Sequence, residues 1–199
     1  MLRRLLPVLA LPALVCAAEG VTPPERFDLL SFEVGIDMAH TKDWGNANGQ
    51  FFALNIPTKG VTLGYFYEST KGLAESNDNG GTATKVDAAL TFHEIRVLKT
   101  IPATSNTLDL GVGVGAGEFK TTIQGGAQTS ANAATVGDVF LKFTPISGGE
   151  KVKGALNLTA GYRFVRFSAV DADAGATDFS DNVDNMDALH FGLSAEFGF

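Results

Sequence analysis

The stretch Leu189-His-Phe-Gly-Leu-Ser-Ala-Glu-Phe-Gly-Phe199, at the end of the sequence, has a strict two-residue period. One of its faces carries Leu189, Phe191, Leu193, Ala195, Phe197 and Phe199, and the other carries His190, Gly192, Ser194, Glu196 and Gly198. Because successive side chains of a β-strand point to opposite sides, the pattern predicts a strand with one large apolar wall and one small or polar wall. A transmembrane β-barrel requires such strands, since one wall meets lipid and the other lines the lumen.

Seven further segments alternate in the same way, which brings the expected number of strands to about eight. Their apolar faces are Leu30, Phe32, Val34, Ile36 and Met38; Phe52, Leu54 and Ile56; Val61, Leu63, Tyr65 and Tyr67; Val86, Ala88, Leu90 and Phe92, then Ile95 and Val97; Leu108, Leu110, Val112, Val114 and Ala116; Val139, Leu141 and Phe143; and Leu156, Leu158, Ala160, Tyr162 and Phe164. The change of parity after Phe92 predicts a β-bulge near His93 and Glu94. The expected fold class is therefore all-β, an antiparallel up-and-down transmembrane β-barrel.

The connections between these segments alternate between long and short. The long ones are 41–50, 70–85, 120–135 and 170–187, and the short ones are 57–60, 99–106 and 145–153. Outer-membrane barrels have long external loops and short periplasmic turns, so the long connections are predicted to form four external loops. An even number of strands brings both ends of the barrel back to the periplasmic side.

The first residues have the features of a secretory signal peptide. Met1-Leu-Arg-Arg4 is basic, the run from Leu5 to Val15 is apolar but too short to span a bilayer as a helix, and small residues follow. We therefore expect residues 1–18 to be a cleaved signal peptide and 19–199 to be the barrel domain, with lipidation of Cys16 as the alternative. Cys16 is the only cysteine, so the mature chain is expected to contain no disulfide.

A soluble lipocalin-like barrel also has two-faced strands, but its apolar face points inward. The composition of the polar face separates the two folds. Four glycines share one face of a single predicted strand, namely Gly111, Gly113, Gly115 and Gly117. A wall that faces water usually carries Lys, Thr and Glu, whereas a crowded lumen alternates small residues with bulky ones. The glycine face therefore favours the membrane barrel.

If the polar faces line a lumen, charges of both signs lie inside the barrel. The expected ion network consists of Glu33, Asp138, Lys142, Arg163 and Glu196, with Arg163 against the two glutamates. Asp37, Glu68 and Asp87 are expected on the same wall, together with Arg96 if the bulge is present. Buried charges are costly unless they pair, and the interior of an eight-stranded barrel is just wide enough for side chains to fill. We therefore expect a plugged lumen, and the alternative is an ion or solute path gated by these charges.

The connection 170–187 contains six aspartates. Asp171, Asp173 and Asp178, around Gly175, weakly resemble a calcium loop, but the third acidic ligand before the glycine and the closing Glu of an EF-hand are missing. The prediction is therefore a solvated acidic loop, with no metal and no cofactor. The formal net charge of −7 also argues against nucleic acid as a partner, because phosphate binding needs clustered Lys and Arg.

Catalysis is not expected from the histidines. They are His40, His93 and His190, of which His40 lies where the first strand meets an external loop, with Ser69 or Asp37 as conceivable partners. The His-x-Ser-Asn motif of lipid A deacylases is absent, and no nucleophile, base and orienting group can be assembled. A lipid-modifying enzyme is therefore the least favoured alternative.

The segment that ends in Phe197-Gly-Phe199 resembles the C-terminal insertion signal that the barrel-assembly machinery reads in bacterial outer-membrane proteins. The architecture resembles the small eight-stranded group that includes the transmembrane domain of OmpA, OmpX-like adhesion and resistance proteins, and opacity-type surface proteins. The resemblance implies location in the cell outer membrane, contact with lipopolysaccharide and other lipids, and a structural or surface-interaction role toward an external ligand or host surface. An OmpW-like conduit for small or hydrophobic solutes is the second hypothesis.

Overall fold

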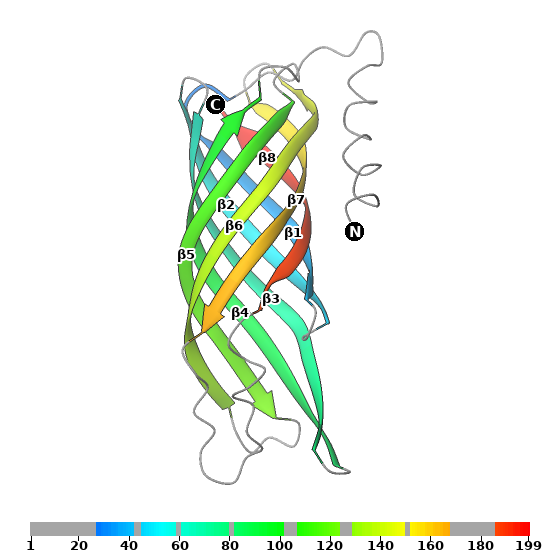
Figure 1. The fold of residues 1–199 in the computed structure, drawn as a ribbon. Coiled ribbons are helices and arrows are strands. Elements are labelled where there is room, and N and C mark those ends of the chain that lie inside the picture. The colour runs from blue at the N-terminus through cyan, green and yellow to red at the C-terminus, as the bar shows by residue number, and fades with distance from the viewer. Residues whose placement is uncertain are drawn as a thin grey trace.

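The computed structural model describes residues 27–41, 45–58, 61–79, 82–101, 107–123, 129–149, 152–167 and 186–199. They form β1 (Ser31–Thr41), β2 (Asn46–Thr58), β3 (Val61–Asn79), β4 (Thr82–Thr100), β5 (Leu108–Ile123), β6 (Thr129–Gly148), β7 (Lys153–Phe167) and β8 (Ala188–Gly198). The strands follow one another around a closed barrel (Figure 1), and each is antiparallel to its neighbours. The predicted all-β fold with eight antiparallel strands is confirmed, while the predicted signal peptide, residues 1–18, lies outside the described residues.

The predicted C-terminal strand closes the barrel. β8 pairs with β1 from Ser31 opposite Gly198 to Thr41 opposite Ala188. Beyond this pairing, the Phe199 carbonyl oxygen accepts hydrogen bonds from the backbone N–H groups of Asp28 and Leu29, at 3.2 and 3.1 Å. Residues 27–30 and Phe199 therefore lie at one end of the barrel, the terminal end, and the opposite end is the loop end (Figure 1).

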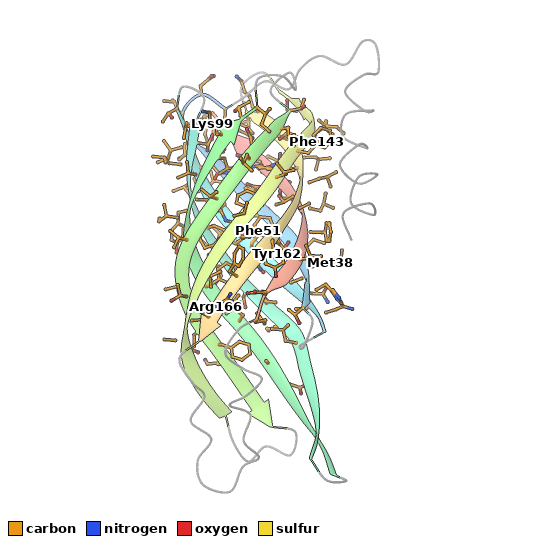
Figure 2. All side chains as sticks on the ribbon, viewed as in Figure 1. Met38, Phe51, Lys99, Phe143, Tyr162 and Arg166 are labelled. Atoms are coloured by element: carbon orange, nitrogen blue, oxygen red, sulfur yellow. The ribbon has the colours of Figure 1, made fainter. Side chains whose placement is uncertain are left out.

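The outer wall of the barrel is apolar. On β1, Phe32, Val34, Ile36 and Met38 are 49–58% exposed, whereas Glu33 between them is 6% exposed. Figure 2 shows such side chains standing outward from the ribbon, Met38 among them. A soluble barrel would place these groups inside, so the outer wall is the wall that faces lipid. No helix among the described residues is long and apolar enough to cross a membrane.

The bulge predicted in β4 is wrong. Pairing between β3 and β4 is unbroken from Val61 opposite Lys99 to Lys71 opposite Ala89, and the register shift lies farther along, between Lys71 and Leu73. Because the parity never changes, Leu90 and Phe92 point inward and are buried, while Ile95 and Val97 point outward. β4 is therefore a regular strand whose apolar residues lie on the outer face near the terminal end and on the inner face near the loop end. Two further expectations change with it: Asp87, expected on the inner wall, is exposed, and Arg96 lies in the interior although there is no bulge.

The same exchange of polarity occurs on neighbouring strands. On β5 the outward residue Val114 is 65% exposed, but nearer the loop end Glu118 and Lys120 are exposed and Phe119 between them is buried. On β7, Arg166 is exposed and Val165 is buried. The buried apolar groups at this level form the loop-end core, which includes Leu73, Leu90, Phe92, Phe119, Val136, Val165 and Met186. A polar outside around an apolar inside is the pattern of a barrel in water, so the lipid-facing band ends here.

Two of the predicted long loops are largely strand. β3 and β4 pair as far as Asn79 opposite Thr82, inside the predicted loop 70–85, and β5 and β6 continue to Ile123 and from Thr129. Figure 1 shows these two hairpins extending beyond the other strands at the end away from the C-terminus. The sequence analysis missed the extension because a hairpin in water pairs its backbone without needing an apolar outer face. The extension therefore carries paired β-strands beyond the lipid-facing band.

Candidate functional site

Polar side chains inside the barrel form two clusters at different levels, and these are the candidate functional site. The seam cluster, near the terminal end, consists of Ser31, Glu33, Asn55, Lys142, Asn157, Ser194 and Glu196. The central cluster lies between it and the loop-end core and consists of Asp37, Glu68, Glu94, Arg96, Asp138, Arg163 and His190. The three levels follow one another along β1: Glu33 belongs to the seam cluster, Asp37 to the central cluster and Ala39 to the loop-end core.

The seam cluster satisfies every oxygen of its two glutamates. Lys142 Nζ lies 2.8 Å from Glu33 Oε2 and 2.7 Å from Glu196 Oε2. Asn55 and Asn157 each donate to both glutamates, over 2.9–3.2 Å. Ser194 donates to Glu33 and Ser31 donates to Glu196. Each of the four carboxylate oxygens thus accepts two hydrogen bonds, which is the condition for burying two like charges side by side.

In the central cluster, Arg163 is the residue with the most acidic contacts. Its guanidinium donates two parallel hydrogen bonds to Glu68, 3.0 and 2.9 Å long, and lies 3.3 Å from Asp37 and 3.5 Å from Asp138. Thr70 adds a 2.7 Å hydrogen bond to Glu68. A bidentate arginine–carboxylate pair is the strongest arrangement open to these groups, so it joins β7 to β3 across the lumen.

Arg96 and His190 complete the central cluster. Arg96 contacts Glu94 through Nε and Asp138 through Nη2, both at 2.8 Å, and its guanidinium lies 3.2 Å from the centroid of the Phe66 ring. His190 lies between Asp37 and Asp138, with Nδ1 3.2 Å from the first and Nε2 2.9 Å from the second. Ion pairs and the stacking of Arg96 on Phe66 together stabilise these charges in the interior of a barrel whose outer wall faces lipid.

Glycines on the inner wall make room for these large groups. A Cβ atom on Gly111 would lie 2.2 Å from Cζ of the Phe140 ring, and one on Gly161 would lie 2.4 Å from His190 Nε2. Such approaches are far inside van der Waals contact. The glycines of the inner wall therefore leave space that is filled by large side chains from other strands.

The interior residues predicted from the sequence are placed as follows. Glu33 and Glu196 contact Lys142 rather than Arg163, which instead contacts Glu68, Asp37 and Asp138. The expected pairing of Arg163 with Glu33 and Glu196 is therefore not the one that the structure has. The outward position expected for Phe143 is also wrong, because this side chain is 6% exposed next to a register shift between Phe143 and Ile146.

Other predicted residues lie away from the clusters. Phe197 and Phe199, assigned to the insertion signal, are 51% and 59% exposed at the terminal end. Asp171, Asp173 and Asp178 lie outside the described residues, and no group of three or more His, Cys, Asp or Glu side chains in the described ranges is arranged to hold a metal ion.

Several interior residues were missed at the sequence level. Glu94 was not predicted as an interior residue because the expected bulge was placed at this position. Its two-residue spacing from Arg96, which puts both on one face of a regular strand, was the signal that could have identified it. Asn55 and Asn157 gave no signal, since a lone amide in an alternating strand reads as any polar residue. Their role depends on facing strands, which the sequence does not order in three dimensions.

On the outer wall, an aromatic cluster lies over β2, β3 and β4. The rings of Phe52, Tyr65, Tyr67 and His93 have centroids 4.9–5.9 Å apart, and the Tyr65 hydroxyl contacts His93 Nδ1. Aromatic residues with a polar tip are typical of the membrane interface. His40, considered for catalysis, lies outside with Nδ1 2.7 Å from Asn46 Oδ1, while Asp37 is an interior residue in contact with His190.

Solved structures with this fold are found among bacterial surface proteins. Two structures of Ail, the attachment invasion locus protein of Yersinia pestis, match. One is 12% identical with a TM-score of 0.53, over 85% of this chain and 98% of that chain. The other, in complex with the heparin analogue sucrose octasulfate, is 14% identical with a TM-score of 0.51, over 84% and 96%. Neisserial surface protein A is 11% identical with a TM-score of 0.52, over 88% and 100%.

These identities show the fold, and the fold is that of the small eight-stranded outer-membrane barrels. The resemblance inferred from the sequence is confirmed at this level. Comparison with protein-family models and with curated proteins gives no match.

Proposed function

We propose that the protein is an integral outer-membrane barrel with a structural or surface-interaction role, and that its loop end is displayed outside the cell. The observation that carries the proposal is the exchange of polarity along β4 and β5. Ile95 and Val114 stand out into lipid, whereas Glu118 nearer the loop end is exposed and polar around the buried Phe119. Strands that leave the lipid and keep their own core form a firm base for contact with an external ligand or host surface.

The proposed route to the membrane uses segments near both ends of the sequence. Residues 1–18 would direct export, and Phe197 and Phe199 would be read by the barrel-assembly machinery. In the folded barrel, Lys99 and Arg166 lie near opposite edges of the outer wall (Figure 2). Cations at the edges of an apolar band suit the lipid headgroups, including lipopolysaccharide phosphates at the loop end.

The orientation is tested by single-cysteine labelling of intact cells with a membrane-impermeant maleimide. Lys120→Cys, at the loop end, is expected to react in intact cells, and Lys99→Cys, near the terminal end, only after lysis. Ile95→Cys, in the lipid-facing band, serves as the control that stays unlabelled in both. Labelling of Lys99→Cys but not Lys120→Cys in intact cells would contradict the proposed display of the loop end.

We do not expect this chain to bind the heparin analogue that is bound to Ail. Lys120 lies 2.8 Å from Glu118, and Arg166 contacts Asp187, so two exposed cations of the described loop end are already paired with acids. A sulfated ligand needs a cluster of available Lys and Arg. We therefore expect no saturable binding of labelled heparin to the barrel in liposomes, and the ligand to be recognised by other chemistry.

The interior supports a closed lumen rather than the OmpW-like conduit. Arg163, Phe92 and Phe119 are each at most 1% exposed and lie on different strands around the interior. The test is conductance of the refolded barrel in planar bilayers, with a heat-modifiable band as proof of insertion. A silent bilayer supports the structural role, whereas stable channels altered by Arg163→Ala would make the lumen a pathway.

A further inference from the structure

The charges of the central cluster do not balance as drawn. Four carboxyl groups, those of Asp37, Glu68, Glu94 and Asp138, face two guanidinium groups and one imidazole. All four carboxyl groups are at most 3% exposed. A buried negative charge without a counter-charge costs several kcal/mol, so the cluster requires further positive charge.

His190 supplies part of this charge. Its two ring nitrogens lie 3.2 Å from Asp37 Oδ1 and 2.9 Å from Asp138 Oδ1. A neutral imidazole has one N–H group and could donate to only one of these carboxylates, leaving a lone pair against the other. The imidazolium form has an N–H group on each nitrogen, so neither nitrogen sets a lone pair against a carboxylate. With His190 charged, the cluster still has one more negative charge than positive charges.

The oxygen atoms show where the remaining imbalance lies. Both oxygens of Glu68 accept from Arg163, and Asp37 and Asp138 each have a cationic nitrogen within 3.3 Å of either oxygen. Asp37 Oδ2, Asp138 Oδ1 and Glu94 Oε1 are all buried and accept no hydrogen bond from the described residues. Glu94 differs from the other two because Oε1 also has no ion-pair contact there: its contact with Arg96 is made through Oε2 alone. Glu94 as a whole is 1% exposed.

The seam cluster provides the contrast inside the same barrel. It too has one more carboxylate than cations, since Glu33 and Glu196 share Lys142. There, amides and hydroxyls supply the missing hydrogen bonds to every oxygen. A full set of hydrogen-bond donors favours the charged form of a carboxylate over the neutral one, and Glu94 has no such set.

We propose that Glu94 holds a bound proton and is a neutral carboxylic acid in the folded barrel. The described residues offer no metal site there, because no three His, Cys, Asp or Glu side chains are arranged to hold an ion. A neutral acid with one oxygen unpaired is far cheaper to bury than a charged one. The proton makes the positive and negative charges of the central cluster equal.

Charged groups on several strands face this site. Arg96 is on β4 with Glu94, Asp138 comes from β6, and Arg163 and Glu68 come from β7 and β3. On β5 the neighbour is Gly113, where an added Cβ would lie 3.0 Å from Glu94 Oε2, so no charged side chain faces the acid from that position. Deprotonation would place a new negative charge beside Asp138, with Arg96 already shared between the two carboxyl groups.

Infrared spectroscopy of the folded barrel is the direct test. The wild-type protein at neutral pH is expected to show the carbonyl stretch of a protonated carboxylic acid, shifted when glutamate is labelled with carbon-13. Glu94→Gln is expected to abolish this band, and Glu118→Gln, on the exposed outer face of β5, to leave it unchanged. Absence of a protonated glutamate band in the labelled wild type overturns the proposal, whatever the folding of the variants.

Stability against pH gives a second readout. Folding would take up one proton at Glu94, so the unfolding constant is expected to rise about tenfold per pH unit once an unfolded glutamate is ionised. The window from about pH 5 to 6 isolates this effect, because an unfolded histidine is still largely charged there. Glu94→Gln is expected to remove the slope and Glu118→Gln to keep it. An equal slope in wild type and Glu94→Gln would contradict the bound proton.

Discussion

Glu33 on β1 and Glu196 on β8 are paired residues at the seam where the barrel closes, and both side chains point inward. Lys142 reaches them from β6, 2.8 and 2.7 Å away. Two carboxylates at this position repel each other unless a cation lies between them. The first and last strands of the barrel are thus joined by a charge from a strand that pairs with neither.

Lys142→Met is therefore expected to be strongly destabilising. Removing the ammonium leaves two buried carboxylates without a cation, which costs about 3–5 kcal/mol. The free energy of unfolding, measured by urea titration of the folded electrophoretic band in lipid, gives the value. Lys71→Met, at an exposed lysine on β3, is the control and is expected to change it by less than about 0.5 kcal/mol. A similar small effect for both variants would show that the seam does not depend on the lysine.

The edge of the lipid-facing band predicts effects of different size for one substitution at two positions of β4. Ile95→Lys places a charge in lipid and is expected to destabilise the barrel by about 2–4 kcal/mol if the site is near the bilayer midplane. Thr91→Lys, four residues nearer the loop end on the same face, is expected to change stability by about 0–1 kcal/mol. Unfolding of both variants in the same bilayer measures the difference. Equal losses would contradict the position of the edge.

The clearance at Gly111 predicts a steric effect. Gly111→Ala would place a methyl group 2.2 Å from the Phe140 ring, and forcing that ring aside costs about 1–3 kcal/mol. Gly148→Ala is the control, because nothing lies within 4 Å of its added Cβ. The double variant Gly111→Ala, Phe140→Leu is expected to recover part of the loss in urea unfolding. No recovery would show that the methyl group clashes with something other than the ring.

The sequence pattern correctly predicted both the strand and its outward face where that face lies in one environment along its whole length. On β8 the outward residues from Leu189 to Phe197 all meet lipid and the inward ones all line the interior, so the period and the face were both predicted. On β4 the outer environment changes from lipid to water between Ile95 and Thr91. The apolar residues then change face without any change in the backbone, and the pattern was misinterpreted as a bulge.

Interior pairing was less predictable for a geometric reason. The strands of a barrel are tilted and staggered, so the residues that meet across the lumen depend on register and shear as well as on position along each strand. Glu33 meets Lys142 and Arg163 meets Glu68, and neither separation in sequence indicates this. The residue types expected inside were largely right, while the partners required the coordinates.

Arg163 and Glu68 provide a test of how much a buried ion pair contributes to the free energy of unfolding. Their bidentate contact joins β7 to β3, and both residues are at most 1% exposed. Arg163→Met leaves Glu68 as an uncompensated buried charge, so a loss of about 3–5 kcal/mol is expected in urea unfolding. Adding Glu68→Met removes that charge and should restore part of the loss, because replacing both partners by apolar groups is often neutral. Asp37 and Asp138 also contact Arg163 and remain in the double variant, so full recovery is not expected. A double-mutant cycle gives the coupling energy, and strictly additive losses would show that the two residues do not act as a pair.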